Sequence, residues 1–262
     1  MLILKLGGSV ITDKSKPFTP RLDVIRRLAK EIHEARQEKG IKLIIGHGGG
    51  SFPHTSAKKY ETHKGIINEE SYRGICMVQN DASKLNRIMV DELIKAGENA
   101  ISIQPSSSCI TKKGRISEWY FDPIKKVLEY DLLPVVYGDV ALDTEMGCCI
   151  ISTEEIMNYL ARNFKSSRLL IGGKVDGVFT SDPNRNKEGK FIPVITKENF
   201  PEIKKYLTSS DGIDVTGGML HKVERLLELT DLGIESEIIN VDKPNVLKMA
   251  LLGKKVLGTI VK

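Results

Sequence analysis

Three glycine-rich turns in the sequence have the residue types that phosphate binding requires. They are Gly7-Gly8, Gly48-Gly49-Gly50 and Gly217-Gly218. Each lies at the end of a predicted strand or at the start of a predicted helix, where uncovered backbone N–H groups hold phosphate. Lys5, Lys14 and Lys222 lie near these turns and would add positive charge. The combination predicts phosphoryl chemistry.

Each of these signals is weak when it is taken alone. Ordinary strand-to-helix turns also contain glycine, and most of the 39 lysine and arginine residues are expected on the solvated surface. Lys5 differs, because it ends a short apolar run that is typical of a buried strand, where a charge needs an anionic partner. Phosphoryl transfer needs amides, cations and Mg²⁺ around the transferred group, with donor and acceptor held in line.

The motifs of several other enzyme classes are absent from the sequence. It contains no G-x-x-x-x-G-K-[ST] phosphate loop and no G-x-G-x-x-G motif after a strand. It contains no G-x-S-x-G elbow, which argues against an α/β-hydrolase. The four cysteines form no C-x-x-C pair and no H-E-x-x-H occurs, so we expect free thiols and no metal site built from protein side chains.

Composition limits the class of protein. The chain has 262 residues, 28% of them charged, which is ordinary for one large globular domain or two fused lobes. The net charge of +5 is modest and aromatic residues make up only 6%, so we expect a small-molecule substrate and no nucleic acid. No apolar run approaches the ~20 residues of a membrane helix and no signal segment begins the chain, so a cytoplasmic protein without a membrane partner is expected.

The glycine turns are connected by segments that alternate between strand and helix. Apolar runs predict strands at Met1–Leu6, Lys42–Gly46, Ala100–Ile103, Leu133–Tyr137, Arg168–Ile171, Glu235–Asn240 and Leu257–Val261. Helical periodicity predicts helices at Arg21–Lys39, Glu69–Ala96, Pro123–Tyr130, Ser152–Phe164, Leu220–Leu232 and Pro244–Leu252. Hairpins are predicted at Cys109–Ile116 and Val140–Ile151. Such alternation predicts an α/β fold whose parallel-rich sheet has helices on both faces.

Taken together, the turns and several short motifs resemble the amino acid kinase superfamily. The shared motifs are Lys5-Leu6-Gly7-Gly8-Ser9, His47–Phe52, Asp176-Gly177-Val178 and Asp182-Pro183. Within the superfamily the chain resembles the isopentenyl phosphate kinases of archaea. The motifs that favour this group are Gly48–Phe52 with His54, Ser102–Ser107, Tyr137-Gly138-Asp139 and Asp214–Met219. The resemblance runs over essentially the whole chain.

The resemblance implies a fold, a reaction and a division of the chain. The fold would be a three-layer α/β/α sandwich with a mainly parallel central sheet. The enzyme would use ATP and Mg²⁺ to phosphorylate isopentenyl phosphate to isopentenyl diphosphate, in isoprenoid biosynthesis of the mevalonate type. Residues 1–165 would form the acceptor lobe and residues 166–262 the nucleotide-binding lobe, fused into one sheet. A homodimer is also expected, and the long Glu69–Ala96 helix offers a surface for it, although core packing alone would explain that helix.

The resemblance also implies roles for individual residues. ATP would be bound by Lys5, Leu6, Gly7, Gly8, Ser9, Gly50, Lys174, Gly217 and Lys222. The acceptor would be bound by Gly49, His54 and Thr153, with His54 hydrogen-bonded to its phosphate. The catalytic residues would be Lys5, Lys14, His54 and Lys222, with Lys14 stabilising the transition state. The helix after His54 and the Glu69–Ala96 helix would line an apolar pocket for the prenyl tail.

Four positions near the predicted site depart from the family pattern. Pro53 replaces a glycine before His54 and lacks a backbone N–H. Thr153 replaces a glycine that contacts substrate, so its side chain is expected to crowd the acceptor, and Glu154 replaces a shorter aspartate. Lys174 also departs from the family pattern, and a lysine at this position is similar to the bacterial uridylate kinases instead. Two alternatives therefore stay open: a kinase of the same fold for another small phosphate, phosphonate or nucleoside monophosphate, and a nucleotide-binding regulatory protein with weak catalysis.

Overall fold

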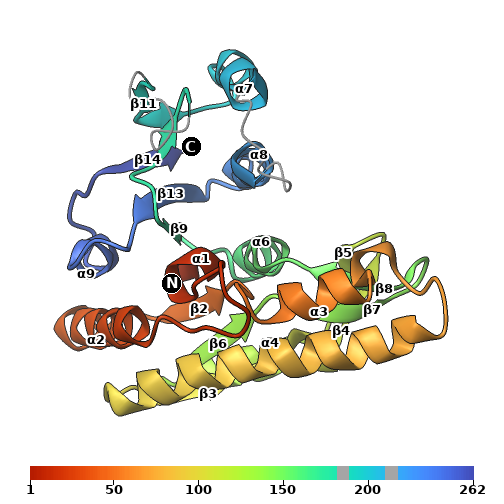
Figure 1. The fold of residues 1–262 in the computed structure, drawn as a ribbon. Coiled ribbons are helices and arrows are strands. Elements are labelled where there is room, and N and C mark those ends of the chain that lie inside the picture. The colour runs from red at the N-terminus through yellow and green to blue at the C-terminus, as the bar shows by residue number, and fades with distance from the viewer. Residues whose placement is uncertain (182–188, 210–217) are drawn as a thin grey trace.

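The computed structural model describes residues 1–181, 189–209 and 218–262, whose arrangement is shown in Figure 1. An eight-stranded sheet forms the centre, with the strand order β12-β14-β13-β9-β1-β2-β6-β3. Its strands are β1 Leu2–Leu6, β2 Leu43–His47, β3 Ala100–Ser102, β6 Leu133–Tyr137, β9 Arg168–Gly173, β12 Val194–Ile195, β13 Glu235–Asn240 and β14 Gly258–Val261. Neighbouring strands run parallel except β13 and β14. The predicted α/β fold with a mainly parallel sheet is confirmed.

The central strands are short, apolar and covered on both sides. Every residue of β1, β2 and β6 is buried, as expected for parallel strands between two layers of helices. Successive side chains enter opposite cores, so that Leu4 packs on one face of the sheet and Ile3 on the other. Because β1, β2 and β9 are parallel neighbours, their carboxyl ends lie side by side, between the two layers of helices.

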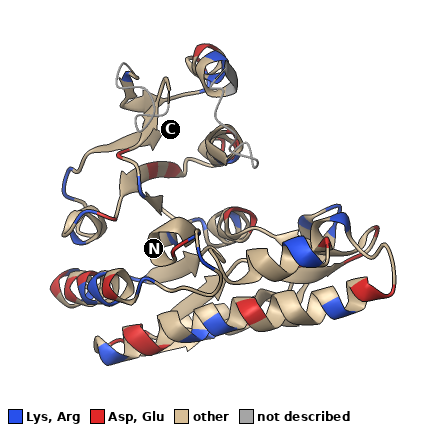
Figure 2. Cartoon of the chain, in the orientation of Figure 1, with Lys and Arg blue, Asp and Glu red and all other residues tan. Residues whose placement is uncertain are grey.

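Helices cover both faces of this sheet. One face packs against α1 Gly8–Ile11, α2 Leu22–Lys39, α4 Glu70–Lys95 and α9 Val246–Leu251. The other face packs against α5 Asp122–Glu129, α6 Thr153–Phe164, α7 Phe200–Ser209 and α8 Gly218–Thr230. Figure 2 shows positive and negative residues interspersed along α2 and α4. None of the helices in the described ranges is long and apolar enough to cross a membrane.

A second, four-stranded sheet packs against α3 Pro53–Lys59 and α4. Its order is β5-β4-β7-β8, with β4 Cys109–Lys112, β5 Arg115–Trp119, β7 Asp139–Asp143 and β8 Gly147–Ile151. The Asp143 carboxylate joins the two hairpin turns, because it accepts hydrogen bonds from the N–H groups of Gly114 at 2.8 Å and Met146 at 2.9 Å. Both predicted hairpins are confirmed.

The far edge of the main sheet differs from the sequence prediction. The strand predicted at Leu257–Val261 is present as β14, but it does not form the edge of the sheet, because β12 pairs with its outer side. The strands β10 Val178–Phe179, β11 Phe191–Ile192 and β12 have two residues each, too few for a periodic pattern. Helix α7 and the short 3-10 helices Thr62–Lys64 and Pro105–Ser107 were not predicted either.

Two connections join the segments that were predicted to form two lobes of one sheet. Strand β9 pairs with β1 on one side and with β13 on the other. Glu31 of α2 is 4% exposed and accepts hydrogen bonds from the Arg27 guanidinium at 2.6 Å and from the N–H groups of Asn245 and Lys248 at 3.1 Å. These bonds hold the start of α9 against α2. The division into an acceptor lobe and a nucleotide lobe stays a prediction.

Candidate active site

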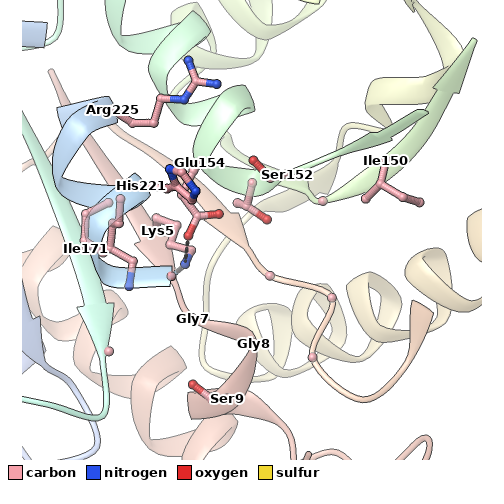
Figure 3. Close-up of a pocket in the computed structure, with 18 of the residues that line it drawn as sticks. Lys5, Gly7, Gly8, Ser9, Ile150, Ser152, Glu154, Ile171, His221 and Arg225 are labelled. Atoms are coloured by element: carbon pink, nitrogen blue, oxygen red, sulfur yellow. Dashed lines mark hydrogen bonds and ion pairs between the residues drawn. The ribbon is translucent and has the colours of Figure 1, made fainter. Parts of the chain in front are cut away.

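A pocket of about 900 Å³ lies at the carboxyl ends of β1, β2 and β9, and Figure 3 shows it in close-up. The predicted site residues that line it are Lys5, Gly7, Gly8, Ser9, Lys14, Gly49, Gly50, His54, Thr153, Lys174 and Lys222. Leu6 does not line it, because its side chain is fully buried in the core. Gly217 lies outside the described residues. The structure thus brings together residues from five separate parts of the chain.

The first two glycine turns touch each other through their backbones. A Cβ atom on Gly8 would lie 2.5 Å from the Gly50 nitrogen, and one on Gly48 would lie 2.8 Å from the Gly8 nitrogen. Gly50 has a φ of +56°, a left-handed conformation that glycine adopts without strain. The Gly48 N–H donates to the Leu6 carbonyl at 2.9 Å and holds the second turn against the end of β1. A side chain at Gly8 or Gly48 would force the turns apart.

These turns carry backbone donors that the fold leaves unused. Within the described ranges, the N–H groups of Gly8, Ser9, Gly49 and Gly50 have no hydrogen-bond acceptor. All four residues line the pocket. Neighbouring N–H groups that converge on a cavity form a binding surface for an anion. The seam between the two turns is therefore suited to bind phosphate.

Lys5 forms an ion pair with Glu154, drawn as a dashed line in Figure 3. Lys5 Nζ lies 2.6 Å from Glu154 Oε1, and the side chains are 8% and 28% exposed. Burial alone would raise the pKa of Glu154, but the charges of Lys5 and Lys222 lower it to about 2. The carboxylate is therefore ionised at neutral pH and fixes the Lys5 ammonium at the pocket wall. Glu154 is the anionic partner that the buried position of Lys5 requires.

Three further lysines meet at the same pocket from separate elements. Lys14 follows α1, Lys174 follows β9 and Lys222 lies on α8. Lys14 and Lys174 are exposed, so their flexible stems can follow a ligand. Their positive charges line the same pocket as the free N–H groups of the glycine turns. This distribution of charge favours a polyphosphate ligand.

Pro53 and His54 begin helix α3 beside the second glycine turn. Pro53 occupies the first turn of the helix, where a backbone N–H would have no acceptor within the helix, so the missing N–H of proline costs no hydrogen bond. A Cβ atom on Gly49 would lie 2.2 Å from the Pro53 ring, so the ring packs closely over Gly49. His54 Nδ1 contacts the Gly50 carbonyl oxygen, and the residue lines the pocket. The proline therefore leaves the histidine in the site.

Thr153 contributes little surface to the pocket, although it lines it. Its hydroxyl donates to the carbonyl of His47 at 2.8 Å, and the residue is 3% exposed. The bond ties the start of α6 to the end of β2. The hydroxyl thus points to the backbone of β2, and the crowding of the acceptor by this side chain stays a prediction.

One end of the pocket is apolar. It is lined by Ala57 of α3, Val78 of α4, and Ile150 of β8. The same residues pack with Val140 and Cys148 in a small core beneath the second sheet. Helices α3 and α4 therefore both contribute apolar side chains to the pocket, as expected, whereas the contribution of β8 was not predicted from the sequence. The binding of a prenyl tail there stays a prediction.

Other pocket residues were also missed by sequence reasoning. Asp139 lines the pocket and is 1% exposed; burial raises its pKa, and its carboxylate accepts hydrogen bonds from the N–H groups of Val140 and Ser106. The motif Tyr137-Gly138-Asp139 supported the family resemblance, but its sequence did not indicate that the Asp139 carboxylate would bind backbone N–H groups. Arg115 and Arg225 come from β5 and α8, and no sequence pattern places them at the pocket.

Comparisons with known proteins agree with this geometry. The profile of the amino acid kinase family matches residues 1–240. The isopentenyl phosphate kinase of Methanothermobacter thermautotrophicus is 40% identical over 99% of this chain and 98% of its own length. That of Methanocaldococcus jannaschii is 37% identical over 97% and 96%. A solved structure described as isopentenyl phosphate kinase superposes with a TM-score of 0.86 at 36% identity, with both chains fully covered. The resemblance seen in the sequence motifs is confirmed.

Gly49→Ala should disturb the second turn through Pro53. The added methyl group would lie 2.2 Å from the proline ring, so we expect a loss of about 1–3 kcal/mol in unfolding free energy. Pro53→Gly removes the ring, so the double variant should regain most of the lost stability. Urea unfolding of the two single variants and the double variant measures this. Additive effects of the two substitutions would contradict the proposed contact.

Glu154→Gln should change how stability depends on pH. The folded-state pKa of about 2 lies below the ordinary value of 4.5, so the charged form stabilises the fold above about pH 4.5. That contribution is lost as the pH falls from about 4.5 to about 2, and the glutamine variant lacks it at every pH. Urea unfolding across this window should show a steeper decline for wild type than for the variant. Glu129→Gln, at a side chain 56% exposed, is the control and should follow wild type; equal slopes for all three proteins would contradict the account.

Proposed function

The chain belongs to the amino acid kinase family, and on that basis we propose that it transfers the γ-phosphoryl group of ATP to isopentenyl phosphate. The product is isopentenyl diphosphate, for isoprenoid biosynthesis of the mevalonate type. The observation that carries the proposal is the contact between the two glycine turns, with free N–H groups on both and an apolar end beyond the second. Relatives named isopentenyl phosphate kinase, 37% and 40% identical over nearly the whole chain, support the same acceptor.

The ATP phosphates bind at the first glycine turn. The N–H groups of Gly8 and Ser9 are free to donate to them. Lys5, Lys14 and Lys222 neutralise the charge that develops on the γ-phosphoryl group in the transition state. Because Glu154 already holds Lys5 in place, that ammonium needs no reorganisation during the reaction. Lys174 and Gly217 complete the nucleotide side in this proposal.

The acceptor phosphate binds at the second turn, against the Gly49 N–H. The Gly50 carbonyl can only accept a hydrogen bond, so His54 Nδ1 carries a proton and Nε2 is left for the ligand. In its imidazolium form His54 donates this second N–H to a phosphate oxygen. An acceptor oxygen then attacks the γ-phosphorus in line, the bond to the β–γ bridging oxygen breaks, and ADP leaves.

The apolar end of the pocket supports a prenyl acceptor. Ala57, Val78 and Ile150 offer a five-carbon tail contacts worth about 0.8 kcal/mol for each CH₂ removed from water. These three side chains offer no hydrogen-bonding group to a nucleobase. The acceptor end therefore favours a prenyl phosphate over a nucleoside monophosphate.

Mg²⁺ fits this site as an ion carried by the nucleotide. In the described part of the chain, no group of three or more histidine, cysteine or acidic residues could hold a metal. Mg²⁺ keeps several waters and takes phosphate oxygens as ligands, so it needs no cage of protein side chains. Glu154 is the carboxylate beside Lys5 at the phosphate end of the pocket. When bound, the ion supplies positive charge to the transferring group.

A homodimer and a cytoplasmic location complete the proposal. Helix α4 exposes Tyr72 and Ile94, which are 60% and 52% accessible. Exposed apolar side chains along one long helix suit contact with a second copy of the chain. Size measurement in solution and localisation in the native cell decide these two points.

His54→Ala should reduce kcat/KM for isopentenyl phosphate by about 10²–10³-fold, because the acceptor phosphate loses a charged donor at the reacting centre. The KM for ATP should change little, since ATP lies at the other turn. A coupled assay of ADP release measures both parameters. His63→Ala, at an exposed position outside the pocket, is the matched control and should behave as wild type.

A panel of acceptors separates this proposal from a different acceptor or from a binding protein. We expect isopentenyl phosphate to be used far better than a nucleoside monophosphate or a small phosphonate. ATP binding measured by calorimetry without turnover of any acceptor would contradict an enzymatic role. Equal turnover by wild type and His54→Ala would contradict the role of the histidine.

A further inference from the structure

His47 ends β2 directly before the second glycine turn and has no part in the mechanism described above. It is fully buried, and its ring stacks on that of Tyr137 with 5.7 Å between the centroids. Its backbone carbonyl accepts hydrogen bonds from the Gly138 N–H at 3.1 Å and from the Thr153 hydroxyl at 2.8 Å. A polar ring in such a position needs a partner for each nitrogen.

Both ring nitrogens of His47 have such a partner. Nδ1 lies 3.2 Å from the Gly48 carbonyl oxygen, and Nε2 lies 3.1 Å from the side-chain nitrogen of Asn86. Because a carbonyl oxygen only accepts, Nδ1 carries the proton and Nε2 accepts from the Asn86 amide. The Ser102 hydroxyl donates to Asn86 Oδ1 at 2.5 Å and sets the orientation of that amide. The donors therefore run in one direction, from Ser102 to the Gly48 carbonyl.

The ring is neutral under ordinary conditions. Burial lowers the pKa of His47 to about 4. Asn86 is 1% exposed, so water does not compete for the bond to Nε2. A buried network in which each donor meets an acceptor holds its members in one orientation.

The bond to Gly48 determines where the next N–H points. In a planar trans peptide the carbonyl and the following N–H point in opposite directions. The Gly48 carbonyl is turned inward to the buried His47 ring, so the Gly49 N–H on the same peptide points away from that ring. Gly49 lines the pocket, and its N–H has no acceptor within the described ranges.

We propose that His47 is a positioning residue, which holds the Gly48–Gly49 peptide so that the Gly49 N–H faces the acceptor phosphate. This inference rests on the proposed function, because it assigns the acceptor to the second turn. Glycine on both sides of the peptide permits it to rotate easily when the Nδ1 donor is lost. A rotated peptide presents its carbonyl oxygen to the phosphate, and like charges then repel.

A pair of substitutions at His47 tests the inference by kinetics. His47→Leu keeps an apolar side chain but has no donor, and should raise the KM for isopentenyl phosphate about tenfold or more while the KM for ATP changes less than twofold. His47→Gln keeps a donor and should recover most of the loss. An unchanged KM in the leucine variant, or an equal rise for both substrates, would overturn the proposal.

Nitrogen NMR of the wild-type protein provides a second test that needs neither turnover nor a stable leucine variant. With the five histidines labelled and His47 assigned through its glutamine variant, its ring should show a protonated Nδ1 and a bare Nε2 from pH 6 to pH 8. A protonated Nε2, or titration within this range, would overturn the proposal.

The amide signal of Gly49 separates a failure of this inference from a failure of the proposed function. If the enzyme does not turn over isopentenyl phosphate, the proposed function is wrong. The positioning role of His47 can still be tested, because it requires that inorganic phosphate shifts the amide signal of Gly49 in the wild-type protein. The shift should persist in His47→Gln and be lost in a folded His47→Leu protein. No shift in wild type would overturn the positioning role.

Discussion

The contact between the two glycine turns determines the geometry of the site. Strands β1 and β2 are parallel neighbours, so the turns that follow them lie side by side at one edge of the sheet. Only 2.5 Å would separate a Cβ atom on Gly8 from the Gly50 nitrogen, so a larger residue would displace one turn from the other. The close approach brings two sets of free N–H groups together. Phosphoryl transfer depends on such proximity, because donor and acceptor phosphates must meet in line despite their like charge.

The surrounding elements hold this seam through contacts made by residues that depart from the family pattern. The Pro53 ring packs over Gly49, the Thr153 hydroxyl binds the end of β2, and Glu154 pairs with Lys5. Each departure is accommodated by a specific neighbour. Lys174, the fourth such residue, adds its charge to the pocket. The departures are thus compatible with the same arrangement of donor and acceptor.

The sequence predicted the parts of the site that depend on local patterns. Glycine turns after apolar runs, and the lysines beside them, are recognisable because strand, turn and helix follow one another directly. The partner of Lys5 was not identified, since Glu154 lies 149 positions away and only the fold brings the two together. The tautomer of His47 likewise depends on Asn86 and Ser102 from other elements. Two-residue strands such as β12 carry too little pattern to be seen in a sequence.

A crystal structure with a non-hydrolysable ATP analogue, Mg²⁺ and isopentenyl phosphate tests the central claim most directly. The account predicts the γ-phosphate at Gly8 and Ser9, the acceptor phosphate at Gly49 and His54, and Gly50 between them. The prenyl tail should lie against Val78 and Ile150. An acceptor phosphate bound away from the second glycine turn, or a γ-phosphate separated from it by a side chain, would contradict the account.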